Sequence, residues 1–173
     1  MLSSLLKFVQ VVGSDGILPC LSKLTIKENS ELSRLPVFPS SLQSLKVQEC
    51  TNLTSLSQSL QRLTSLRKLH LSGCRRLQFG QEESLPSKLQ DVDISDCWKL
   101  MLVTGLKNLT SLKSLALSRC PLLQISPDEC LPCTPQLVVI TDCPRLKEWC
   151  KRHHFPLNQV LPISCPEEFL LVR

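Results

Sequence analysis

Four of the side chains that can bind soft metals in the last third of the chain have a spacing that could form a zinc site: Cys130, Cys133, Cys150 and His153. The first two form a Cys-x-x-Cys pair, the spacing at which two thiolates share one zinc ion or exchange as a redox pair. A zinc site would need the other two side chains to complete a tetrahedral set. This chemistry depends on the elements that carry the four residues, and a sequence repeat identifies those elements.

A pattern of leucines with an asparagine or cysteine at its ninth position recurs six times along the chain. It reads Leu-x-x-Leu-x-Leu-x-x-(Asn or Cys)-x-x-Leu, with valine, isoleucine or proline at some leucine positions. The steps between successive ninth positions are 21, 24, 23, 23 and 23 residues. A period of about 20 to 29 residues with this consensus is typical of a leucine-rich repeat solenoid. The ninth positions, called the ladder residues below, are Asn29, Cys50, Cys74, Cys97, Cys120 and Cys143.

The repeat explains the Cys-x-x-Cys pair without a metal. A shift of two coils, 46 residues, aligns Cys130 and Cys133 with Ser84 and Ser87 of an equivalent Leu-Pro phrase. We therefore interpret the pair as part of a returning segment between strands, and predict neither a metal nor another cofactor. A structural zinc site stays the alternative, which a zinc assay on the purified protein decides.

Each copy of the repeat predicts one short strand. Residues around its two central apolar positions alternate, so one side of the strand faces a core and the other faces solvent. Leu-Pro pairs at 35–36, 85–86 and 131–132 disfavour full helices between the strands. The sequence therefore predicts an α/β repeat fold. We expect a leucine-rich repeat solenoid that forms a short arc, with a parallel β-sheet on its concave face and irregular or short helical returns.

The repeat covers most of the chain and predicts one domain. We expect an irregular or truncated repeat segment over residues 1–17, about six coils over residues 18–155, and a degenerate capping coil or tail over residues 156–173. In the last segment Pro162 takes a core strand position, where proline disfavours pairing with a further strand. The N-terminal segment has no comparable cap, so further coils are expected upstream.

The ladder residues lie where the chain turns out of each strand, and backbone groups there need partners. Asn29 can donate and accept hydrogen bonds, whereas the five cysteines are compact and weakly polar, so they fill the ladder mainly by packing. The chain has ten cysteines. Because the ladder accounts for five of them at one-coil spacing, we interpret these as reduced thiols in a reducing compartment, and predict a cytoplasmic protein.

Two glycosylation sequons, at Asn52 and Asn108, are instead typical of secreted proteins. Both belong to an Asn-Leu-Thr-Ser-Leu phrase that includes core leucines of the repeat. We therefore interpret the sequons as by-products of the repeat pattern.

Several function classes are disfavoured by the composition. No run of 18 apolar residues and no good signal peptide is present, so we expect no membrane partner. A net charge of +5 and scattered aromatic residues argue against nucleic-acid binding. His70 is expected on the solvent side of a strand, where the repeat places no serine or cysteine nucleophile next to it. Without a phosphate loop, paired carboxylates or triad spacing, the chain is predicted not to be an enzyme.

The outward strand positions predict a surface for a protein partner. Their types change from coil to coil: basic to polar in coils one to three, acidic in coil four, and small or apolar in coils five and six. Such variation suits a recognition surface, although drift of exposed positions would give a similar list. The candidate partner-binding residues are Lys23, Thr25, Lys46, Lys68, His70, Asp91, Asp93, Ala116 and Val139.

The phrases Asn108-Leu-Thr-Ser-Leu112 and Asp142-Cys-Pro-Arg-Leu-Lys-Glu-Trp-Cys150 resemble the C-terminal repeats of plant nucleotide-binding leucine-rich-repeat disease-resistance proteins. The resemblance covers residues 18–155, and the Cys-Pro-x-Leu-Lys-Glu-x-Cys ending is its most specific part. The chain departs from that family because it has no Gly-x-x-x-x-Gly-Lys-(Ser/Thr) loop. Nucleotide binding is therefore not carried over.

This resemblance implies the ligand-sensing and autoinhibitory repeats of an intracellular immune receptor, without its nucleotide-driven switch. The implied partner is a pathogen effector or a host protein, or a nucleotide-binding domain in a parent chain. The alternative is a leucine-rich-repeat substrate adaptor of a ubiquitin ligase, whose repeats are longer and more helical. An extracellular receptor is disfavoured because the Asn-x-Leu-x-Gly-x-Ile-Pro phrase is missing.

Overall fold

The computed structural model describes residues 21–56, 60–80, 84–126, 130–131, 137–153 and 170–172. The expected N-terminal segment 1–17 lies outside these residues, as does most of the expected tail 156–173. No helix in the described ranges combines the length and apolar character needed to cross a membrane.

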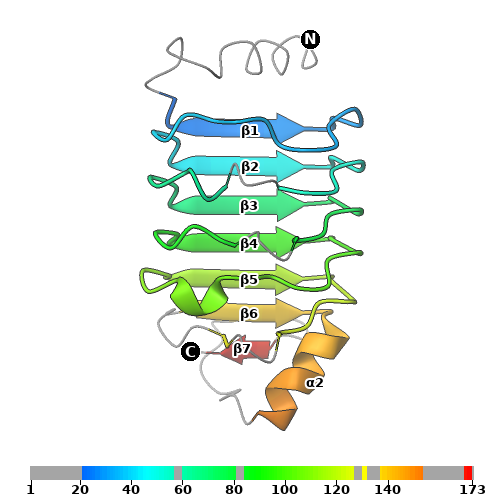
Figure 1. Ribbon diagram of the computed structural model, residues 1–173. Helices are drawn as coiled ribbons and strands as arrows, with labels where there is room; N and C mark the ends of the chain where they lie inside the picture. Colours follow the sequence, from blue (N-terminus) through cyan, green and yellow to red (C-terminus); the bar gives the residue numbers. More distant parts are fainter. Residues whose placement is uncertain are drawn as a thin grey trace, which may run out of the picture.

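Six parallel strands, one for each copy of the repeat, follow one another in sequence order across one sheet (Figure 1). Residues one coil apart are neighbours in this sheet: Leu69 of the third strand lies between Leu45 and Val92. This arrangement confirms the predicted repeat solenoid. The strands are β1 (Lys23–Lys27), β2 (Ser44–Gln48), β3 (Lys68–Ser72), β4 (Asp91–Ser95), β5 (Ser114–Ser118) and β6 (Leu137–Thr141).

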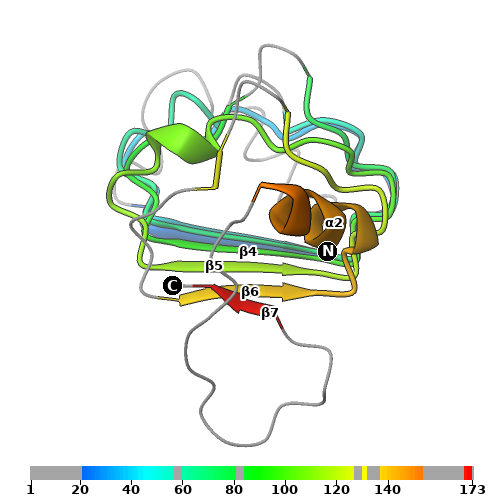
Figure 2. The ribbon, with the colours of Figure 1, turned by 90° about the horizontal axis from the view of Figure 1, so that it is seen from below.

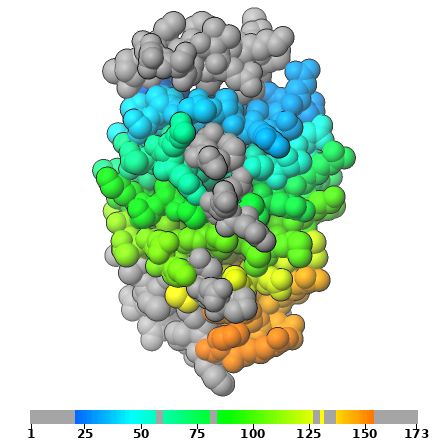
Figure 3. All heavy atoms as spheres, viewed as in Figure 1, coloured from blue at the N-terminus to red at the C-terminus, as the bar shows by residue number. Residues whose placement is uncertain are grey.

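Alternation along each strand separates the core from the solvent side. In β3, Leu69 and Leu71 are fully buried, whereas Lys68, His70 and Ser72 face outward. The same positions repeat in every coil, so the buried leucines form continuous rows that run the length of the solenoid. Burial of these rows drives folding, because no coil can bury its apolar side without its neighbours. Figure 3 shows the coils as successive bands from β1 to the C-terminal helix.

The returning segments run opposite the sheet and are mostly irregular, as expected (Figure 2). One short 3-10 helix, η1 (Leu106–Asn108), begins after Gly105, whose φ of 85° lies in the left-handed region. A Cβ at this glycine would meet the backbone of Leu85 in the preceding coil. The returns are joined by backbone hydrogen bonds from coil to coil, such as the amide of Thr54 donating to the carbonyl of Ser33.

The residue before each ladder position adopts a left-handed conformation that turns the chain out of the strand. Its φ lies between 49° and 67° in all six coils. Left-handed backbone costs a residue with a Cβ about 1 kcal/mol or more, so the solenoid imposes this turn against local preference. The six residues are Glu28, Glu49, Gly73, Asp96, Arg119 and Asp142.

The ladder residues follow this turn and are buried. The side-chain oxygen of Asn29 accepts hydrogen bonds from the amides of Glu31 and Leu32, both at 3.0 Å. Each ladder cysteine is fully buried, and its thiol donates to the carbonyl two residues earlier, at 3.3 to 3.7 Å. The cysteines therefore add weak hydrogen bonds to the packing that the sequence predicted.

One α-helix, α2 (Pro144–Arg152), follows the last ladder residue. Proline at its first position already has the helical φ and needs no amide partner, and Lys151 and Arg152 lie in the last turn. Leu146 and Cys150, four residues apart, are buried against the final coil. The sequence did not lead us to predict this helix, because Leu146 also fits the last leucine position of the repeat.

A seventh strand, β7 (Leu170–Val172), pairs with β6 in the antiparallel direction. The expected last coil would have continued the parallel stack, but Pro162 and its neighbours lie outside the described residues. The described strand shows that the C-terminal edge of the parallel sheet is paired. Pairing occupies backbone groups that an open edge would expose.

Candidate functional site

The outward side chains of the six strands form one surface, called the sheet face below. Two rows of side chains run along it, and the parallel register places residues of adjacent coils side by side. One row is Lys23, Ser44, Lys68, Asp91, Ser114 and Leu137, and the other is Thr25, Lys46, His70, Asp93, Ala116 and Val139. All of the candidate partner-binding residues therefore lie on this face, and none belongs to the buried core.

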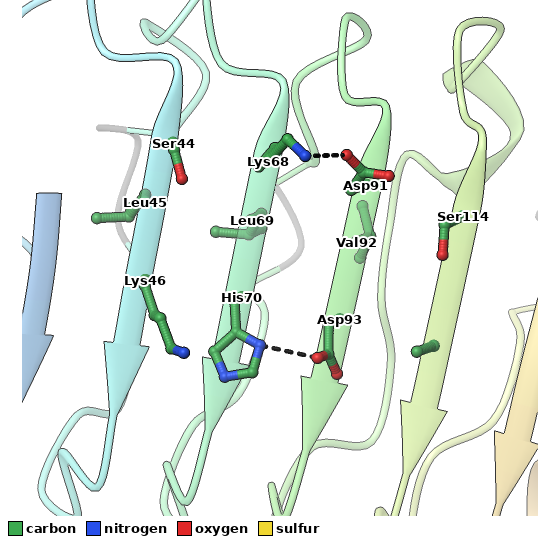
Figure 4. Close-up of a pocket in the computed structure, with 11 residues that line it drawn as sticks. Ser44, Leu45, Lys46, Lys68, Leu69, His70, Asp91, Val92, Asp93 and Ser114 are labelled. Atoms are coloured by element: carbon green, nitrogen blue, oxygen red, sulfur yellow. Dashed lines mark hydrogen bonds and ion pairs between the residues drawn. The ribbon is translucent and has the colours of Figure 1, made fainter. Parts of the chain in front are cut away.

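A hollow of about 290 Å³ lies on the sheet face over β2 to β5 (Figure 4). Its floor is formed by the strands at Leu45, Leu69 and Val92, whose side chains are buried on the core side, and the charged side chains of β2, β3 and β4 project around it. Polar and small residues of β2 and β5 complete the lining. The remaining lining residues are Ser44, Lys46, Lys68, His70, Asp91, Asp93, Ser114 and Ala116.

An ion pair and a histidine–aspartate hydrogen bond join β3 to β4 across the hollow. The amine of Lys68 lies 3.0 Å from a carboxylate oxygen of Asp91, and Nδ1 of His70 lies 2.8 Å from a carboxylate oxygen of Asp93. Side chains of the first pair are 66% and 39% exposed, so water screens their attraction. The pairs orient the side chains more than they stabilise the fold.

His70 is held on both sides of its ring. Because a carboxylate only accepts hydrogen bonds, Nδ1 carries the hydrogen that is donated to Asp93. Nε2 lies 3.4 Å from the amide nitrogen of Gln48, which can donate to it when the imidazole is neutral. Among the described residues, no serine or cysteine is bonded to either ring nitrogen. The arrangement fixes the ring for binding and offers no activated nucleophile.

The charge of the sheet face changes along the solenoid. Lys46 on β2 forms no ion pair within the described residues, and Figure 4 shows its amine directed toward β3. Beyond the two aspartates of β4, the outward residues become small on β5 and apolar on β6. There Leu137 remains 38% exposed and gives the β6 end of the sheet face an apolar side chain.

The ladder cysteines have no access to solvent and form no disulfide. Hydrogen bonding with Cys120 and Cys74, followed by burial, raises the pKa of the Cys97 thiol far above its ordinary value. Hydrogen bonding with Cys120, followed by burial, also raises the pKa of Cys143. Burial alone is the main reason that the pKa of Cys50 is raised. The pKa values of Cys74 and Cys120 are instead lowered, mainly by hydrogen bonds with neighbouring ladder thiols. Because all five ladder thiols are fully buried, they suit packing and not attack on a substrate.

The candidate metal ligands are dispersed or undescribed. Cys130 is exposed, and Cys133 lies outside the described residues. Cys150 is buried in α2, where burial raises the pKa of its thiol to about 11. His153 donates from Nδ1 to the carbonyl of Trp149 at the end of the same helix. Within the described ranges, no three metal-binding side chains come together.

Two contacts at the rim, where the chain leaves the strands, were not predicted. Arg119 binds Asp96 through two hydrogen bonds of 2.7 Å, and this guanidinium lowers the pKa of the carboxyl group. The guanidinium of Arg75 lies 4.7 Å from the ring centre of Trp98, which is 51% exposed. Alignment of the coils contains the signal for both, because each pair joins residues 23 apart.

The comparisons with known proteins identify no relative. No family model matches the chain, and neither the curated proteins nor the solved structures searched contain a match.

Proposed function

We propose that this chain is a non-enzymatic protein-recognition module that binds its partner through the sheet face. The observation that supports the proposal best is the contrast between the two sides of the same strands. The inward side is a uniform row of leucine, valine and isoleucine, whereas the outward side varies in charge and size from coil to coil and encloses a hollow. The uniform side accounts for the fold, and the varied side remains for recognition.

The sheet face is well suited to binding because its side chains are already ordered. Strands that pair on both sides hold the backbone, and the contacts of Lys68 and His70 with β4 restrict two of the longer side chains. Binding then loses less conformational freedom than it would on a mobile loop. A surface of this kind favours one partner through charge complementarity.

The proposal extends to the cell biology that the family resemblance implies. The chain acts as the ligand-sensing and autoinhibitory repeats of an intracellular plant immune receptor, in the cytoplasm. Its partner is a pathogen effector, a host protein or a nucleotide-binding domain of a parent chain. The buried and unpaired ladder thiols support a reducing compartment, because neighbouring thiols at one-coil spacing stay reduced there.

The experiment is proximity labelling in plant cells with the full chain and a sheet-face variant that combines Lys46→Glu and Asp93→Lys. A matched control, Lys107→Glu, changes a charge on η1 at the opposite side of the solenoid. Partners labelled by the wild type and the control, but lost in the sheet-face variant, are then purified and titrated by calorimetry. We expect the sheet-face variant to weaken binding at least tenfold.

Stability measurements separate binding from folding. Lys46→Glu should change the free energy of unfolding by less than about 0.5 kcal/mol, since its side chain lies outside the core. Asp93→Lys also loses the contact with His70 and should cost less than about 1 kcal/mol. If a purified partner binds the sheet-face variant as tightly as it binds the wild type, the binding surface lies elsewhere and the proposal is wrong.

A further inference from the structure

We propose that the sheet face binds a helix of its partner that lies across the strands. This helix presents an acidic, a basic and an apolar side chain in that order, each two turns from the next. The inference rests on the proposed function and specifies the partner's chemistry at the same site.

The order of partner residues follows from the order of charges along the sheet. The amine of Lys46 on β2 attracts a carboxylate. On β4, Asp91 and Asp93 each use one carboxylate oxygen for the ion pairs with β3, and the other oxygen has no partner among the described residues. A guanidinium or amine of the partner binds there. The third position is apolar, because Leu137 and Val139 of β6 present no charge.

Backbone pairing explains why recognition uses side chains. Strands β2 to β5 are each paired with a strand on both sides, and β6 lies between β5 and β7. The amide and carbonyl groups of β2 to β5 are therefore occupied, and an extended segment of the partner has no open edge to extend between these strands. What the sheet face offers is a side-chain surface with a hollow, on which small residues of β5, Ser114 and Ala116, allow close approach.

The strand spacing favours a helix over an extended segment. Parallel strands lie about 4.8 Å apart, so β2 and β4 are separated by about 9.6 Å, and β4 and β6 by the same distance. Two helical turns rise about 10.8 Å, and residues seven apart project from the same side. An extended chain covers about 10 Å in three residues, which places consecutive contact residues on opposite sides. An α-helix therefore presents all three side chains to the sheet face, whereas a β-extended segment does not.

The test is a selection from a helical peptide library displayed on phage, with the full chain as the target. Seven outward positions of a 21-residue helix of about six turns are randomised, including three positions that are seven residues apart. We expect enriched clones to carry an acidic, a basic and an apolar residue at these three positions, read in one chain direction. The wild-type chain and the Lys107→Glu control should bind such a clone equally.

Charge exchange tests the contacts individually. We expect Lys46→Glu to weaken binding of an enriched clone about fivefold or more, since attraction becomes repulsion. Exchange of the clone's acidic residue for lysine should restore binding to the Lys46→Glu variant and weaken binding to the wild type. The corresponding exchange with Asp93→Lys should behave in the same way at the basic position.

Several results overturn the inference. The helix and its pattern are refuted if the enriched clones carry another order of charges, or if the selection yields no binders. They are also refuted if the clones bind the Lys46→Glu and Asp93→Lys variants as tightly as the wild type. The proposed function fails separately: it fails when a natural partner binds the Lys46→Glu, Asp93→Lys variant normally. A natural partner that needs the sheet face but binds through loops would refute the inference and leave the proposed function intact.

Discussion

Leu69→Ala and His70→Ala change adjacent residues of β3 on opposite sides of the sheet, and their costs should differ several-fold. Leu69 is 1% exposed, and its neighbours in the buried row, Leu45 and Val92, are 0% and 1% exposed. Removal of three buried carbons loses about 2.4 kcal/mol of transfer free energy. Because the neighbours are held by their own strands, part of the cavity remains, and we expect a total loss of about 4 kcal/mol.

The His70 side chain gives the contrasting result. It is 27% exposed, and its bond to Asp93 is screened by water, so His70→Ala should cost less than about 1 kcal/mol. Urea unfolding followed by circular dichroism measures both variants, with comparison of midpoints at equal slope. If Leu69→Ala does not fold, Leu69→Val should cost about 1 kcal/mol in the same assay. The assignment of the two sides would be refuted if Leu69→Ala cost less than about 0.5 kcal/mol. It would also be refuted if His70→Ala cost more than Leu69→Ala.

Three further predictions concern the turns, the thiols and the rim. Gly73→Ala should lower the free energy of unfolding by about 1 to 2 kcal/mol, because its φ of 67° disfavours a Cβ; an unchanged urea midpoint would contradict this. Iodoacetamide at pH 8 should alkylate Cys130, which is exposed, and spare Cys150 until urea is added, since the pKa of its buried thiol is about 11; peptide mass spectrometry would reveal equal labelling if this is wrong. Arg119→Ala should cost less than about 1 kcal/mol at pH 7. Because the folded pKa of Asp96 is lowered, its stabilisation is present above the unfolded pKa and is lost as the pH falls, so the difference between variant and wild type should shrink below about pH 4; a constant difference would exclude the ion pair as its cause.

The fold could be predicted from the sequence because every coil repeats the same alternation of buried and outward positions. A leucine at the position of Leu69 has to be buried, and a residue at the position of His70 has to face outward, whatever the neighbouring coil contains. The register follows from the constant period, and the register alone places Lys68 beside Asp91. The cross-strand contacts of Lys68 and His70 were therefore contained in the alignment of the coils, although we did not predict them from it.

The structural features that we did not predict lie where the repeat ends or where its pattern does not determine the structure. Helix α2 depends on Pro144 at its first position and on Leu146 facing the core, a local signal that was assigned to the repeat. Strand β7 runs antiparallel, and its three residues carry no pattern that specifies a direction. The hollow on the sheet face depends on side-chain conformations over four strands, which periodicity does not determine.

Photo-crosslinking at two positions tests the central claim, that the sheet face binds a protein partner, most directly. A benzophenone amino acid replaces Lys46 on the sheet face or, in the control, Lys107 on η1. Both proteins are irradiated with the partner that proximity labelling identifies. We predict a crosslink from position 46 and none from position 107. Crosslinking from position 107 alone would contradict the claim and place the partner on the returning segments.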